Sequence, residues 1–139
     1  MSVSFRILSH LGVVYVRYEG HAKMAETLEA FSEYAQHQDF RPGQKQLVDL
    51  THVTGWDEEY LELLKTQAKK ADAFIGNKSE TLIVYLAPTE IGQKIAHLAM
   101  RSWEPFPAVV PIVHDTETGA LAILGLPFVS LTDLLTRSA

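Results

Sequence analysis

A run of polar residues lies directly behind an apolar stretch in "LVDLTHVTGWD", Leu47 to Asp57. Carboxylate, hydroxyl and imidazole groups of this kind can transfer protons or hold a hydrogen-bonded ligand. Histidine is the side chain best suited to proton transfer near neutral pH, so His52 and Asp57 are candidates for an acid–base pair. Asp49, at the end of the apolar stretch, has a simpler interpretation as a structural acceptor for N–H groups of the following loop.

The elements expected around this run would place it at one edge of a sheet. "KQLVDL" (45–50) is typical of a short buried strand and "TLIVYLA" (81–87) of a central strand covered on both faces. We expect a helix to begin after each strand, the first with Thr54 as its N-cap. Because ligands of parallel sheets bind beyond the carboxyl ends of the strands, these two loops predict a binding rim. Its residues are Asp49, Thr51, His52, Thr54, Trp56, Asp57, Glu58, Thr89 and Glu90.

Two properties of this rim bear on what it could bind. Its acidic residues occupy the N-termini of both expected helices, which disfavours an anionic ligand such as phosphate. Trp56 could be an exposed anchor for a partner or a plug of the core, since tryptophan is common in both places.

A second candidate surface lies on the helix expected to begin at residues 88–89. Lys94, His97 and Arg101 are spaced three and four residues apart, and Trp103 follows. Such a stripe is common on a solvated helix face. Its functional alternative is a docking face for an acidic partner.

The sequence carries no standard catalytic or cofactor signature. It lacks the G-x-S-x-G, G-x-G-x-x-G and H-E-x-x-H patterns, and it contains no cysteine. Its six histidines are not closely paired, so a metal site would have to be assembled from distant segments. We therefore predict no cofactor and no metal, and an enzyme is the least expected class.

Length and charge limit the remaining possibilities. The 139 residues predict a single domain, residues 1–139, and the net charge of −5 argues against binding of nucleic acid. The longest apolar run falls short of the ~18 residues that would span a membrane, and the first twenty residues do not resemble a signal peptide. We expect a soluble cytoplasmic protein.

The order of patterns predicts an α/β fold. Residues 3–18 indicate an antiparallel hairpin, and strands then alternate with helices, which requires a mostly parallel five-stranded sheet with helices on its faces, β-β-α-β-α-β-α-β-α. Pro111 places the last strand at an edge. The helix after Thr54 is expected to end at Gly76–Asn77. Its apolar stripe is expected to contain Leu61, Leu64, Ala68, Ala71 and Ile75. The extension 126–139 could pack on the core, cover a pocket, or pair two subunits as a homodimer.

Three segments resemble the SpoIIAA-like superfamily, which groups STAS domains with CRAL-TRIO-type domains. They are "VVYVRYEG", "LVDLTHVTGWD" and "IVHDTETGALAILG", within about residues 5–126, and they look most like the small SpoIIAA-like bacterial proteins. In STAS switches the loop after the "Val-Asp-Leu" strand carries a phosphorylated serine. Matched from Asp49, this chain has Glu58 at that position, so the resemblance implies a domain without the switch serine.

The resemblance leaves two main hypotheses for function. The STAS side implies a non-enzymatic regulatory or protein-interaction domain that uses the predicted rim and an unidentified protein partner. The CRAL-TRIO side implies a carrier for a small apolar, lipid-like ligand held beneath the same loops and the C-terminal tail. A buried apolar cavity would distinguish the carrier from the interaction domain. A small enzyme using Asp57 and His52 is the third hypothesis.

Overall fold

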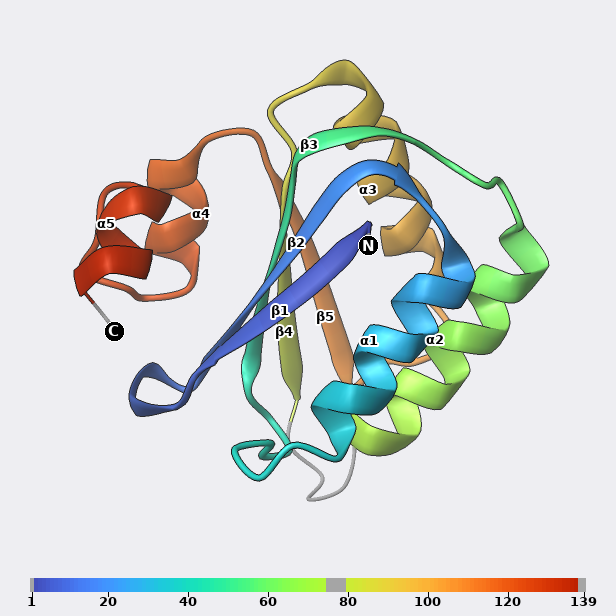
Figure 1. Ribbon diagram of the computed structural model, residues 1–139, viewed down its shortest axis with the longest axis horizontal. Helices are drawn as coiled ribbons and strands as arrows, with labels where there is room; N and C mark the ends of the chain where they lie inside the picture. The colour runs from blue at the N-terminus through green and yellow to red at the C-terminus, as the bar shows by residue number, and fades with distance from the viewer. Residues whose placement is uncertain (1, 75–79, 138–139) are drawn as a thin grey trace.

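The computed structural model describes residues 2–74 and 80–137 as one α/β domain (Figure 1). It has five strands and five α-helices, with a short 3-10 helix in the first hairpin. The elements in chain order are β1 (Val3–Leu8), η1 (Ser9–Leu11), β2 (Val13–Ala22), α1 (Met24–Ala35), β3 (Lys45–Trp56), α2 (Tyr60–Phe74), β4 (Thr81–Leu86), α3 (Glu90–Ser102), β5 (Val109–His114), α4 (Glu117–Ile123) and α5 (Leu131–Arg137). No helix among these residues is long and apolar enough to cross a membrane.

The strands follow one another in the sheet in sequence order, β1-β2-β3-β4-β5. β1 and β2 are antiparallel, and every later pair is parallel. Because each crossover steps in the same direction and parallel crossovers are right-handed, their helices must lie on the same face. Figure 1 shows α1, α2 and α3 together on that face and α4 and α5 on the other. The predicted fold class is confirmed.

The central and edge strands are where their sequences predicted. β4 lies between β3 and β5, and most of its residues are buried. β5 is an edge strand, so the missing N–H of Pro111 is tolerated there.

The prediction for the start of the second helix was wrong. β3 continues to Trp56 and α2 begins only at Tyr60, so Thr54 is a strand residue and not an N-cap. Pairing with β2 decides this, because the ladder runs on to Ala22 opposite Trp56. The expected helix end at Gly76–Asn77 falls outside the described residues.

The far ends of β2 and β3 form a two-stranded extension, which we call the arm (residues 19–22 and 50–56). β3 pairs with β4 only up to Asp49, and beyond it pairs with β2 alone. Two register shifts interrupt the arm, after Arg17 and after Gly20, and Gly20 has a φ of +71°. Such bulges bend strands, and Figure 1 shows β2 and β3 curving towards α1 and α2.

Separate hydrophobic clusters cover the two faces of the sheet. The cluster behind α4 and α5 contains Leu121, Leu124 and Leu134, all of them almost completely buried. The tail helix α5 therefore packs on the face opposite α1–α3.

Replacing Leu134 tests how much this tail contributes to stability. Leu134→Ala should lower the free energy of unfolding by about 2–5 kcal/mol, because it leaves a cavity in a fully buried site. The control is Val129→Ala in the same tail, where the side chain is 68% exposed and the expected change is within about 0.5 kcal/mol. Urea unfolding measures both. Equal small losses would show that α5 does not stabilise the domain.

Candidate functional site

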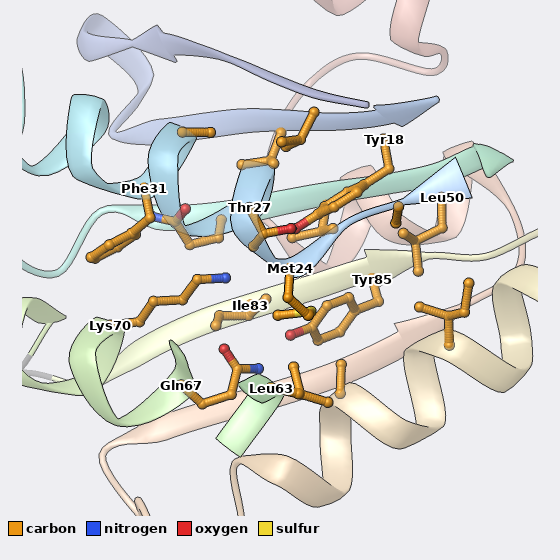
Figure 2. A pocket seen from close by; sticks show the side chains of 18 of the residues that line it. Tyr18, Met24, Thr27, Phe31, Leu50, Leu63, Gln67, Lys70, Ile83 and Tyr85 are labelled. Carbon is orange, nitrogen blue, oxygen red and sulfur yellow. The ribbon is translucent and has the colours of Figure 1, made fainter. Parts of the chain in front are cut away.

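A cavity of about 110 Å³ lies between the sheet and helices α1, α2 and α3 (Figure 2). Its wall is mostly aliphatic and aromatic. The apolar side chains that line it include Tyr18, Met24, Phe31, Leu50, Leu63, Ile83, Tyr85 and Trp103. Such a lining is typical of a small-molecule site, in which a few polar groups are set among apolar ones.

The local structure explains why this space stays open. The arm bends over one end of the cavity and contributes Ala22 and Trp56 to its wall. Among the larger side chains with which α1 and α3 line the cavity are two short ones, Ala30 and Ala99, which take up little of the space.

Two tyrosines on the wall, the partly buried Tyr18 and the buried Tyr85, have hydrogen-bond partners. The hydroxyls of Tyr18 and Thr27 share a hydrogen bond of 3.1 Å, and the Trp103 indole N–H donates to Tyr85 Oη over 2.8 Å. Burial raises the pKa of both Tyr18 and Tyr85, so both phenols are neutral at physiological pH.

Two polar side chains of α2 complete the site. Gln67 is 2% exposed, and its Oε1 has no hydrogen-bond partner in the described part of the chain. Lys70, one turn further on, holds its Nζ 5.9 Å from the centre of the Phe31 ring. Loss of hydration lowers the pKa of Lys70 to about 8. The cavity therefore has a polar side on α2.

The predicted rim is divided by the structure. Asp49 is 1% exposed and accepts hydrogen bonds from Tyr15 Oη, at 2.6 Å, and from the Thr51 backbone N–H, at 3.0 Å. The Thr51 hydroxyl donates to the same carboxylate. Asp49 is therefore a structural acceptor, as its simpler interpretation proposed.

Thr89 and Glu90 lie at the N-terminus of α3, beside the start of the arm. Thr89 caps the helix by accepting from the Gly92 N–H over 3.0 Å. A Cβ on Gly92 would lie 3.1 Å from the Leu50 carbonyl oxygen, so this turn packs directly on β3. Thr89 and Glu90 therefore lie near the end of the predicted rim that contains Asp49, and not near its other end.

The rest of the predicted rim follows the arm towards α1. Asp57 caps α1 from outside, since its Oδ2 accepts from the Met24 N–H over 2.9 Å. Glu58 is exposed, with a φ of 56°. His52 and Thr54 are exposed on the arm, whereas Trp56 is partly buried and lines the cavity. Trp56 is thus a wall residue and not a free anchor.

The separation of His52 and Asp57 along the chain weakens the acid–base hypothesis. His52 and Asp57 are five residues apart along extended chain, which separates their backbones by on the order of 15 Å. Proton transfer needs direct hydrogen bonding or one bridging water.

The basic stripe on α3 is only partly as predicted. Lys94, His97 and Arg101 are exposed along one face, and His97 Nδ1 lies 2.8 Å from the Gln93 carbonyl. Trp103 does not belong to this face, because it is 2% exposed and lines the cavity.

No family model matches the sequence, and a search of the curated proteins finds no relative. The resemblance to the SpoIIAA-like superfamily therefore remains a prediction. In the described ranges, no group of three or more His, Asp or Glu side chains could hold a metal ion.

Sequence reasoning missed the polar residues of the cavity because it misjudged the buried face of α2. Leu61 is 65% exposed and Ala68 is exposed, whereas Leu63 and Gln67 are buried. Among the stripe residues that the structure describes, only Ala71 is fully buried, and Ile75 lies outside the described residues. The available signal was Gln67 and Lys70 at an i, i+3 spacing, which places both on one face.

Lys70 should give the protein a distinctive stability profile between pH 8 and 9.5. Its folded pKa of about 8 lies below the usual 10.5, so in this window the unfolded chain binds the extra proton. The free energy of unfolding should therefore rise with pH, by about 1 kcal/mol after allowing for partial solvent exposure. Denaturant unfolding at both pH values, compared with Lys70→Met, isolates the effect. The same rise in the variant would contradict it.

Proposed function

We propose that this protein binds a small apolar molecule reversibly in the cavity between the sheet and α1–α3, as a carrier or sensor. The observation that supports the proposal is the cavity itself, with its aliphatic and aromatic wall. The buried apolar cavity is the feature that distinguishes the carrier hypothesis from the interaction domain.

The cavity volume limits the size of the ligand. An engineered cavity of roughly 150 Å³ in another protein holds benzene, so about 110 Å³ suits a single ring or a short chain and not a full-length lipid. The ligand is therefore smaller than the lipid-like molecules that the family resemblance suggested.

The C-terminal tail does not take part in the proposed site. Among the described residues, none beyond Trp103 lines the cavity, and α4 and α5 pack on the opposite face of the sheet. Of the alternatives for the tail, packing on the core is therefore the one that agrees with the structure, and a cover over this cavity is not. Access must involve α1, α2, α3 or the arm.

A second proposal keeps the STAS-like interaction role. Leu61 and Tyr60 are 65% and 40% exposed in the first turn of α2, beside the exposed end of the predicted rim. Exposed apolar side chains next to polar ones are the composition of a protein-binding surface.

The cavity proposal is tested by filling the space. Ala30→Leu adds three carbons to a buried residue of the wall, and should abolish binding while keeping the fold. The matched control, Ala25→Leu, changes an exposed residue of the same helix and should bind normally. Native mass spectrometry of the freshly purified proteins detects a copurified ligand. The thermal shift with toluene then measures occupancy of the cavity.

Equal ligand loads in both variants would place the ligand outside the cavity. A bare wild-type protein that also shows no thermal shift with toluene would contradict the proposal.

A further inference from the structure

The unpaired acceptor on the cavity wall, Gln67 Oε1, has a well-defined orientation. Gln67 Nε2 donates to Ser102 Oγ over 3.0 Å, and the Ser102 hydroxyl donates its only proton to the Ala99 carbonyl. This bond directs the N–H side of the amide to α3 and leaves Oε1 as the atom without a partner. A buried acceptor without a partner has lost its hydrogen bond to water, unless something in the cavity donates to it.

A donor lies on the same side of the cavity. Lys70 follows Gln67 by three residues, and Figure 2 shows both side chains reaching from α2 towards the cavity. In the described part of the chain Lys70 forms no ion pair, and its recorded contact is with the Phe31 ring. The polar side of the cavity therefore offers a buried acceptor without a partner, Gln67 Oε1, and a partly exposed donor, Lys70 Nζ.

Gln67 Oε1 and Lys70 Nζ favour some chemical groups of a ligand over others. A hydroxyl can donate to Gln67 Oε1 and can also accept from a neighbouring ammonium such as that of Lys70, whereas a hydrocarbon leaves the buried Gln67 oxygen unpaired. A carboxylate would pair with Lys70 but would face the Gln67 oxygen, and it would lose its hydration in an apolar cavity. A water could also bridge the pair, but it would leave the apolar remainder unfilled.

We infer that the ligand is a neutral, ring-sized molecule with one hydroxyl, a simple phenol or a comparable alcohol. Its apolar body lies among the aromatic and aliphatic side chains of the wall. Its hydroxyl lies at α2, where it donates to Gln67 Oε1 and accepts from Lys70 Nζ. This inference rests on the proposed function and specifies the ligand of that site.

Three probes of the same shape test it on the full-length protein: p-cresol, toluene and p-toluate. They share the ring and the methyl group and differ only in carrying a hydroxyl, nothing or a carboxylate. Titration calorimetry should show p-cresol binding about tenfold more tightly than toluene, with p-toluate the weakest.

Variants assign the preference to the two side chains. Gln67→Met and Lys70→Met should each reduce the p-cresol to toluene ratio towards one while toluene still binds. Lys69→Met, at an exposed neighbouring position, should leave the ratio unchanged. Because the readout is a ratio within one variant, a change in stability does not mimic it.

Each other outcome overturns the inference. Toluene binding as tightly as p-cresol would remove the role of the hydroxyl, and tightest binding of p-toluate would show an anionic ligand on Lys70. A p-cresol preference that survives in Gln67→Met would place the hydroxyl elsewhere. Binding of none of the three probes would also overturn the proposed function.

Discussion

The pairing of β2 with β3 is the constraint on which the rest of the structure depends. It starts at Val13 opposite Lys45 and runs past the end of the β3–β4 ladder to Ala22 opposite Trp56. The Asp57 N–H donates to the Ala22 carbonyl, and the Asp57 carboxylate accepts from the first residue of α1. The ladder therefore sets where α1 begins and where the arm bends, and these two features enclose one end of the cavity.

The sequence predicted those parts of the fold in which the burial of a segment determines its place in the sheet. The uniformly apolar "TLIVYL" indicated the central strand, and Pro111 indicated an edge, because both patterns follow from ladder hydrogen bonding and coverage. The end of β3 could not be predicted, since "THVTGW" has the polar composition of a loop. Only the partner strand makes it a strand, through backbone bonds that side chains do not specify.

The site was predictable only in part. Asp49 was correctly interpreted as a structural acceptor. Trp103 was placed on a docking face and instead lines the cavity, and so does Trp56, for which the sequence left an exposed anchor and a plug of the core both open. A cavity is the shape left between elements, so it depends on how α1 and α3 approach the sheet. Short side chains such as Ala30 and Ala99 give no indication of a cavity in the sequence. The orientation of the buried Gln67 depends on its hydrogen bond to Ser102 of α3, which is 35 residues away in the sequence.

All three crossover helices lie on one face of the sheet. We therefore expect the two faces to differ in how far they can move. The face covered by α4 and α5 is packed with leucines that are almost wholly buried. We expect this face to stay fixed. On the front, α1 and α2 lie side by side, and neither belongs to the hydrogen-bonded ladders of the sheet. We expect the cavity to open and close by a shear motion of the helices over the sheet. The strands would keep their register while a ligand enters or leaves.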